Sequence, residues 1–305
     1  MSVPKRRAAA TDTASSQGAS KHAFFSSWGG GEADLGRDQP GEGSPSGPMS
    51  FAVDSRGGVW VLDQVNERVV RYEDGKPRTS LPLDRPRAQD IAVAEDGSVA
   101  VLDRFGGEDV VLLRPDGTVA GSLPLAGDGI EDIGLVTGLF VDGSNVYAER
   151  EHGPLILLGD TSGVPAPSRD EIAGRPSRDG KLFLKAGITD ATAGRTYVVA
   201  NERPSEDHRF TREIRFDAYV WSIVLLDTDV SGTIYFAVEL EDGGEHAVVL
   251  TCLDPTTGVP QGTAALPANT MPEESFRDFV VLDEGGVLAA LRTENGVQYS
   301  YYECE

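Results

Sequence analysis

The strongest constraint on the fold is an internal repeat that begins at Ser50. Residues 50–63 consist of two apolar runs around a polar, glycine-containing turn, and residues 90–103 show the same arrangement forty residues later. The turn residues Gly57-Gly58 and Asp96-Gly97 favour the positive φ angles that tight hairpin turns require. In both copies two further apolar runs follow the hairpin. Each repeat therefore predicts four antiparallel strands.

Weaker copies of this pattern continue to the end of the chain. The residues expected to enter the first turn of each unit recur about every 46 positions and are Asp54, Ala94, Asp142, Asp190, Asp227 and Asp283. This period is typical of β-propellers. We therefore expect an all-β, six-bladed β-propeller of four-stranded antiparallel blades over residues 21–305. Residues 1–20 are rich in Ala, Ser and Thr and predict a disordered polar leader.

The two ends of the repeat region predict how the ring closes. The sixth unit supplies three strands, which leaves an unpaired edge that invites aggregation. The apolar segment 23–28 is expected to pair with residues 297–302 and to complete the last blade. The alternative is that this segment packs only against the first unit.

The first unit carries several short motifs in a fixed order. They are Phe-Ser-Ser-Trp-Gly at 25–29, Gly-Pro-Met-Ser-Phe-Ala-Val-Asp at 47–54, Val-Trp-Val-Leu-Asp at 59–63 and Asn-Glu-Arg-Val-Val at 66–70. The pattern resembles that of NHL-repeat propellers, closely over residues 23–125 and in part over residues 220–300. The resemblance implies a six-bladed propeller. It leaves the function open, because similar proteins include protein-interaction scaffolds, RNA binders and distantly related lactonases and lyases.

The charge balance narrows the choice of partner. The chain has 49 acidic and 27 basic residues, a formal net charge of −22, and a short basic run at Lys5-Arg6-Arg7. Nucleic-acid binding requires a basic patch that displaces counterions, so we expect no nucleic-acid partner. Apolar runs stay below the roughly 18 residues of a membrane helix, so no membrane insertion is expected. An acidic surface attracts basic groups, which favours another protein or a basic peptide as the partner.

Polar residues are expected at the starts of the inner strands, where they would face the central channel. The candidates are Ser50, Asp90, Thr137, Ser222 and Asp278, and Asp132 is a further acidic one. In the enzymatic propellers that the chain resembles, side chains at such positions hold a divalent cation. The alternative is that they cap strands and turns.

Other signals for a metal or cofactor are incomplete. The four histidines, His22, His152, His208 and His246, share no metal-ligand spacing. Residues 227–232 begin like a calcium loop, but its twelfth position is Val238 instead of a bidentate carboxylate. We therefore expect no cofactor and a hairpin turn at 227–232, with calcium binding as the alternative.

Several other conspicuous residues are expected to be structural. Asp63 recurs as Asp103 in the second repeat, and with Arg68 it indicates a turn-capping ion pair instead of a catalytic pair. Trp60, Trp221 and the aromatic residues of 299–302 are expected to pack between blades.

Long irregular segments are expected to form the recognition face, because recognition concentrates in loops on a rigid scaffold. These segments are 29–47, 162–178 and 202–212. In the last of them, the expected partner contacts are Glu202, Glu206, Asp207 and Arg209. Together these features predict a non-enzymatic binding or scaffold protein, with a metal-assisted lactonase or lyase as the alternative.

The two cysteines, Cys252 and Cys304, end corresponding strands of the fifth and sixth units. A disulfide would pin the C-terminal tail, but it requires Cα atoms within about 7 Å, and corresponding points on adjacent blades are often farther apart. A cysteine pair and a polar leader favour a periplasmic or cell-envelope protein over a cytoplasmic one. The chain has 22 arginines and 5 lysines, which indicates a bacterial source and, with the rest, an envelope assembly.

Overall fold

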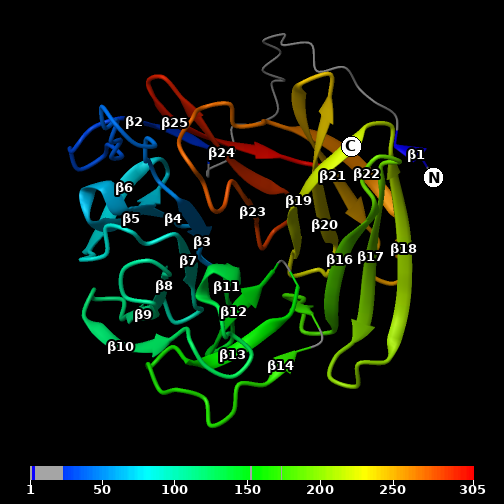
Figure 1. Ribbon diagram of the computed structural model, residues 1–305, viewed down its shortest axis with the longest axis horizontal. Coiled ribbons are helices and arrows are strands. Elements are labelled where there is room, and N and C mark those ends of the chain that lie inside the picture. The colour runs from blue at the N-terminus through cyan, green and yellow to red at the C-terminus, as the bar shows by residue number, and fades with distance from the viewer. Residues whose placement is uncertain (1, 4–22, 152, 173) are drawn as a thin grey trace.

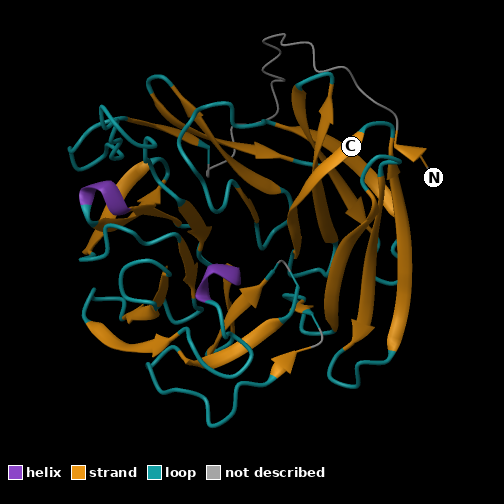
Figure 2. Ribbon diagram, viewed as in Figure 1, coloured by secondary structure: helices purple, strands orange, loops and turns teal. Residues whose placement is uncertain are grey.

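The strands are arranged as a six-bladed β-propeller. The computed structural model describes residues 2–3, 23–151, 153–172 and 174–305. Within these residues the strands form six sheets that surround a common axis, as Figure 1 shows, and each sheet contributes four antiparallel strands to the ring. Figure 2 shows how little helix accompanies them: the 3-10 turns η1 (Gln64–Asn66) and η2 (Ile133–Leu135). No described helix is long and apolar enough to cross a membrane.

Each blade runs from an inner strand near the axis to an outer strand at the rim. Blade 1 is β3 (Ser50–Val53), β4 (Val59–Asp63), β5 (Arg68–Glu73) and β6 (Lys76–Pro82). Blade 2 is β7 (Asp90–Val93), β8 (Val99–Asp103), β9 (Asp109–Leu113) and β10 (Val119–Pro124). Blade 3 is β11 (Val136–Asp142), β12 (Asn145–Arg150), β13 (Leu155–Asp160) and β14 (Glu171–Ile172).

The second half of the ring is built in the same way. Blade 4 is β15 (Arg175–Pro176), β16 (Leu182–Asp190), β17 (Arg195–Glu202) and β18 (His208–Phe216). Blade 5 is β19 (Tyr219–Thr228), β20 (Ile234–Asp242), β21 (Glu245–Leu253) and β22 (Pro260–Leu266). Blade 6 is β23 (Phe279–Val281), β24 (Val287–Thr293), β25 (Gly296–Tyr302) and β2 (Phe24–Ser27).

The predicted closure is confirmed. Strand β2 pairs antiparallel with β25, with Phe24 opposite Tyr299. The Phe24 ring also stacks between Tyr299 of blade 6, at 4.4 Å, and Tyr72 of blade 1, at 4.7 Å between centroids. The segment therefore completes the last blade and packs against the first. Of the predicted leader, residues 1 and 4–20 lie outside the described residues, while β1 (Ser2–Val3) runs parallel to β18.

Blade 4 differs from the sequence prediction. Asp190 was expected to enter the first turn of this unit, but the segment that it ends, β16, is the second strand. The inner strand β15 has two residues, Arg175 and Pro176, and contains no apolar alternation that a sequence pattern could reveal. The prediction therefore placed the first turn of the blade one strand too late.

The core of the molecule consists of apolar seams between neighbouring blades. The seam between blades 2 and 3, for example, combines Leu112 and Leu123 with Leu139 and Ile156, all at most 1% exposed. Similar clusters join blades 6 and 1, 1 and 2, 4 and 5, and 5 and 6. Because each blade is buried on both faces, the polar residues are left to the axis, the turns and the rim.

Blades 4 and 5 have longer strands than blades 1 and 2. Strands β16 to β21 contain 8 to 10 residues, whereas β3, β4, β7, β8 and β9 contain 4 or 5. The extra residues lengthen the hairpins at one end, and the β20–β21 turn stands out at the top of Figure 1. These extensions carry side chains that have no counterpart in the short blades.

A matched pair of substitutions tests the closure. Phe24→Ala removes a buried ring that bridges blades 1 and 6, whereas Phe25→Ala removes its neighbour, which is 46% exposed. We expect Phe24→Ala to lower the free energy of unfolding by about 3 kcal/mol, as for other buried phenylalanines. Phe25→Ala should change it by about 0.5 kcal/mol or less. Chemical denaturation measures both, and equal effects would contradict the closure.

Candidate functional site

One buried carboxylate organises the channel. Asp90, on the inner strand β7, is fully buried and accepts four hydrogen bonds. The donors are the Ser50 hydroxyl (2.5 Å), the backbone N–H groups of Ile91 and Leu139 (both 2.9 Å) and Arg277 Nη2 (2.7 Å). Two of the predicted channel residues, Ser50 and Asp90, therefore come together. Arg277 was not among the predicted channel residues, because it lies outside the repeated motif.

The segment that carries Arg277 crosses one mouth of the channel. The backbone N–H groups of Phe276 and Arg277 both donate to the Met49 carbonyl, at 2.7 and 3.1 Å. Phe276 then packs against the core of blades 2 and 3, and Arg277 donates to the Leu139 carbonyl at 3.0 Å. A chain segment that leads into blade 6 thus contacts blades 1, 2 and 3 across the axis.

Two further arginines tie the blades together around the axis. Arg175 donates to Glu149 of blade 3 at 2.6 Å and to the Leu226 carbonyl of blade 5 at 2.8 Å. Arg178 bridges Asp227 of blade 5, at 2.8 Å, and Asp283 of blade 6, at 2.7 Å. Burial alone would lower the pKa of Arg178, but the two carboxylates outweigh it and hold the pKa above its usual value. We call Arg175, Arg178 and Arg277 the axial arginines.

The other predicted channel residues have separate partners. Thr137 donates to Glu149 at 3.2 Å, and Asp278 accepts from Arg292 at 3.0 Å and from Ser275 at 2.5 Å. Ser222 lies on the extended start of β19, where it donates to Glu239 at 3.2 Å. Asp132 caps η2 by accepting from the Gly134 N–H at 2.9 Å. The six residues thus do not share one site.

The segment that resembles a calcium loop forms a hairpin turn. Asp227 is bound by Arg178, and Asp229 Oδ1 accepts from the backbone N–H groups of Ser231 (2.9 Å) and Thr233 (3.0 Å). In the part of the chain that the structure describes, no three His, Cys, Asp or Glu side chains are grouped as metal ligands. His22 and His152, two of the four histidines, lie outside that part.

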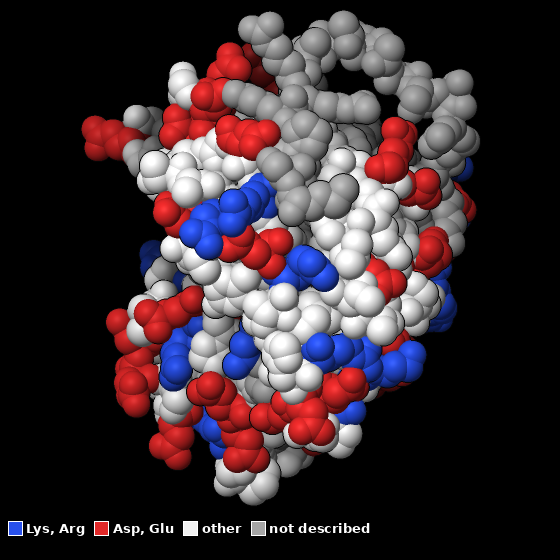
Figure 3. Space-filling view, turned by 90° about the vertical axis from the view of Figure 1, so that its right-hand side faces the viewer, with Lys and Arg blue, Asp and Glu red and all other residues white. Residues whose placement is uncertain are grey.

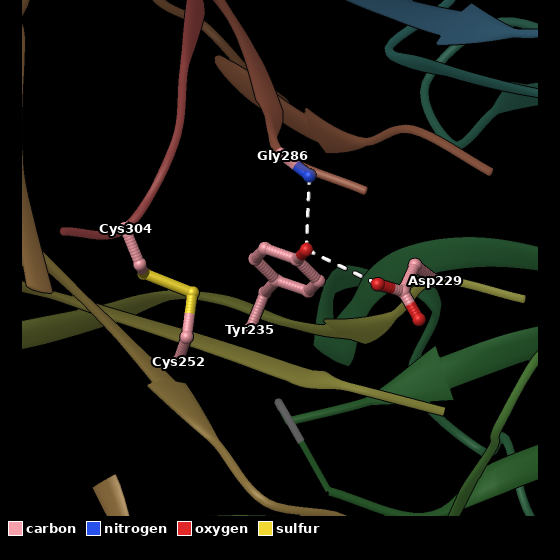
Figure 4. Close-up of a disulfide and its surroundings, with 5 residues drawn as sticks. All are labelled: Asp229, Tyr235, Cys252, Gly286 and Cys304. Carbon is pink, nitrogen blue, oxygen red and sulfur yellow. Dashed lines mark hydrogen bonds between the residues drawn. A yellow bond between two sulfur atoms is a disulfide. The ribbon is translucent and has the colours of Figure 1, made fainter. Parts of the chain in front are cut away.

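A pocket of about 310 Å³ opens at the seam between blades 5 and 6. Three carboxylates line this seam pocket: Asp229, Glu284 and Glu303. Figure 4 shows Tyr235 at its centre, where its hydroxyl donates to Asp229 at 3.1 Å and accepts from the Gly286 N–H at 2.9 Å. The described residues that line the pocket include no Lys or Arg, so the charged side chains among them are all carboxylates.

The titration of the nearby tyrosines reflects this negative charge. Burial raises the pKa of Tyr235, and Asp229 and Glu303 contribute in the same direction. Burial also raises the pKa of Tyr301, helped by its hydrogen bond to Glu303 and by Glu284. In both cases the nearby carboxylates disfavour the negatively charged tyrosinate. The same negative potential would favour a bound cation.

The pocket wall includes a disulfide. Cys252, on β21, and Cys304, just after β25, are bonded, and their Cα atoms lie 6.2 Å apart (Figure 4). The two blades thus approach closely enough at this point for a bridge, within the usual Cα range. The bridge joins the C-terminal tail to blade 5, beside Gln261 and Glu303.

The segment 202–212, which was expected to be a long irregular loop, is the end of β17, a short turn at 203–207 and the start of β18. The four predicted contact residues lie in this turn and on the strand ends beside it. Arg209 binds both oxygens of Glu202, at 2.6 and 2.8 Å, and also donates to the Pro255 carbonyl of blade 5 at 3.3 Å. Glu206 adopts a positive φ of 62°, and Asp207 is exposed. Glu202 and Arg209 are therefore paired with each other, and a role for these four residues in binding stays a prediction.

Two of the residues expected to be structural behave differently from each other. Trp60 is buried and its indole N–H donates to Asp54 at 2.9 Å, as a packing residue would. Trp221 was expected to pack between blades, and this prediction is wrong: its side chain is 58% exposed. The error arose because Trp221 lies on the extension of β19, which the short repeats of blades 1 and 2 do not contain. Asp63 and Arg68 form the expected ion pair at 2.8 Å.

The charged side chains do not form a basic surface on the flank that Figure 3 shows. Lys and Arg are interspersed there with Asp and Glu in small groups. Blade 5 is the extreme case, because residues 219–266 contain seven acidic residues and no Lys or Arg. The arginines that contact this blade come from blade 4: Arg178 binds Asp227, and Arg209 and Arg212 donate to the carbonyl groups of Pro255 and Thr257.

Comparison with known proteins supports the fold. No protein-family model and no curated protein sequence matches the chain. A protein assigned as a 6-phosphogluconolactonase from Bacteroides fragilis has a similar structure, with a TM-score of 0.51, 13% identity and coverage of 91% of this chain and 89% of that one. BamB from Moraxella catarrhalis (0.47, 15%, 84% and 85%) and a virginiamycin B lyase from Staphylococcus aureus (0.46, 12%, 88% and 99%) are also similar. At these identities, the likeness concerns the fold alone.

The disulfide gives a direct prediction. The intact protein, measured by mass spectrometry without reductant, should be two hydrogens lighter than the reduced protein. The bridge closes a loop of 52 residues, so its reduction should lower the free energy of unfolding by roughly 2–4 kcal/mol. Cys304→Ser should show the same loss and no further effect of reductant. An unchanged mass on reduction would contradict the bridge.

Proposed function

We propose that this propeller is a non-enzymatic binding scaffold that holds a basic segment of a partner protein in the seam pocket. The observation that carries the proposal is the contrast between the two polar regions. The carboxylates at the axis are bound to arginines of the same chain, whereas the seam pocket combines Asp229, Glu284 and Glu303 with no Lys or Arg in its described lining.

The axis supports a structural role over the lactonase or lyase alternative. A propeller enzyme of that kind needs channel side chains that are available to a metal or a substrate. Here three of the four hydrogen bonds of Asp90 join it to other parts of the ring, through Ser50, Leu139 and Arg277, and the fourth comes from Ile91 on its own strand. If Asp90 instead bound a metal or a substrate, Arg277 would lose its carboxylate partner near the axis. Breaking such an ion pair costs free energy of folding.

The size and charge of the seam pocket suit a basic side chain. Its volume of about 310 Å³ lies at the lower end of the range for ligand pockets, enough for one Lys or Arg side chain with part of its backbone. The net charge of −22 steers basic partners toward the molecule and makes association faster at low salt. The turn that carries Glu202, Glu206, Asp207 and Arg209 contacts blade 5 through Pro255, and we include it as a second contact region.

The proposed setting is an assembly of the bacterial cell envelope. The disulfide supports this part of the proposal, because such bonds persist in oxidising compartments and are rare in the cytosol. The short motifs of blade 1 further suggest that the chain is a divergent NHL-like propeller, a group that includes protein-interaction scaffolds.

The test is a titration of the isotope-labelled protein with the peptide acetyl-Gly-Lys-Lys-Lys-Gly-amide. The amide signals of Gly262, Gly285 and Gly286, which line the pocket, should shift as the peptide binds. The double variant Glu284→Gln/Glu303→Gln should bind about fivefold more weakly, the loss expected for two partly exposed charges. Asp229 is left intact because it holds the turn and Tyr235.

The control variant Glu131→Gln/Glu294→Gln removes the same charge from exposed turns elsewhere. It should retain the affinity of the unmodified protein at the pocket. Pocket signals that do not respond to the peptide, or equal losses in the two double variants, would contradict the seam pocket as the recognition site.

A further inference from the structure

A β-bulge in blade 5 displays an aromatic side chain to solvent. In the pairing of β19 with β20, Val220 lies opposite Leu240 and Ser222 lies opposite Glu239, so Trp221 has no opposite residue. Bulges of this kind re-aim side chains and often lie beside functional sites. Here the result is an indole that is 58% exposed, on the extended part of the blade.

Two other aromatic rings flank Trp221. The Tyr219 ring lies 6.3 Å from it at an interplanar angle of 64°, and the His246 ring lies 5.4 Å from it at 77°. The strand register explains this grouping, because Tyr219 lies opposite Glu241 and Glu241 lies opposite His246. Residues that are directly opposite on neighbouring strands project from the same face of the sheet. The three rings therefore share one face with Glu241.

A second carboxylate joins this group. Glu239 accepts from His246 Nδ1 at 2.7 Å and from the Ser222 hydroxyl at 3.2 Å, which fixes it beside the rings. The hairpin turn that follows adds Asp242 and Glu245, and the nearest Lys or Arg in the sequence are Arg215 and Arg277. We call Tyr219, Trp221, Glu239, Glu241 and His246 the blade-5 tip.

We propose that the blade-5 tip is a second docking surface, which takes an arginine or lysine side chain from an extended basic segment of a partner protein. The cationic head would lie over the Trp221 ring, where the π-electrons attract it, and its charge would face Glu239 and Glu241. Charge complementarity selects this occupant: the tip combines Glu239 and Glu241 with one histidine and no Lys or Arg, which favours a cation over an anion or a neutral apolar group.

The blade-5 tip and the seam pocket lie at opposite ends of the same strands. Tyr219 begins β19 and Asp229 follows its last residue, so the two sites are about 30 Å apart at the usual rise of a strand. One short segment cannot fill both. The inference therefore goes beyond the proposed function, because it makes the propeller a divalent scaffold that contacts basic segments on two sides.

The experiment uses the isotope-labelled full chain and follows the indole N–H signals of its three tryptophans. The probe is the peptide acetyl-Gly-Arg-Arg-Gly-amide, and a peptide with citrulline in place of both arginines has nearly the same shape without charge. The Trp221 signal, assigned from its loss in Trp221→Phe, should shift with the arginine peptide and stay in place with citrulline. Trp60, which is buried, should not respond.

Affinity measurements separate this site from the seam pocket. Trp221→Ala should weaken arginine-peptide binding at the tip by about two- to fivefold, the range for an exposed cation–π contact. Because this variant lacks the indole, its binding is followed through the backbone amide signals of Glu241 and His246. Phe105→Ala, which removes an aromatic ring that is 59% exposed on blade 2, is the matched control and should have no effect. The pocket variant Glu284→Gln/Glu303→Gln should leave the tip unchanged.

Three results would overturn the proposal. The Trp221 signal could fail to move with the arginine peptide, or move equally with the citrulline peptide, which would exclude a cation-selective surface. It could instead respond to maltohexaose, which would identify a sugar platform. Because the pocket is read from its own glycine amides, failure at the tip leaves the proposed function standing, and failure at the pocket leaves the tip standing.

Discussion

The ion pair between Asp90 and Arg277 lies where four blades of the ring meet. It joins blade 2, which carries Asp90, to blade 1 through Ser50, to blade 3 through the Leu139 N–H and to the lead-in of blade 6 through Arg277. Arg175 and Arg178 do the same for blades 3 to 6. Apolar clusters join neighbouring blades at five seams, Arg175 joins blade 4 to blades 3 and 5, and Arg178 and Arg277 also join blades that are not neighbours. In this arrangement the carboxylates at the axis are bound by arginines of the same chain, which is why the proposed binding sites lie away from the channel.

Buried ion pairs rarely add net stability over a well-packed apolar replacement, because their desolvation is costly. Their effect here is geometric, since a guanidinium group donates in fixed directions and thereby sets the positions of three blades at once. A rigid ring in turn fixes the spacing between the seam pocket and the blade-5 tip. Blade 5 contributes all of the blade-5 tip and one wall of the seam pocket, and its strands and turns contain no Lys or Arg; the proposed preference for basic partners rests on this acidic character.

The sequence predicted the parts of the structure that follow from periodicity. The paired hairpins at Ser50 and Asp90, the six blades and the closure by Phe24 follow from strand alternation, turn residues and the need to cover an edge. Blade 4 was misplaced because its inner strand, Arg175-Pro176, has no periodic signal. Arg277 and Trp221 were missed or misjudged because one lies in a connecting segment and the other at a bulge, and both positions depend on tertiary structure. The seam pocket brings together residues from turns some 75 positions apart, from Asp229 to Glu303, which no local motif records.

The most direct test of the structural axis is a double-mutant cycle on Asp90→Asn and Arg277→Gln, measured by chemical denaturation. Each single variant leaves one partner without its ion pair near the axis and should lower the free energy of unfolding by roughly 3 kcal/mol. The double variant should lose at least about 1 kcal/mol less than the sum of the two, since the second substitution removes a group that is already unpaired. Additive effects within about 0.5 kcal/mol would show that the two residues act independently, and would contradict the account of a channel closed by its own arginines.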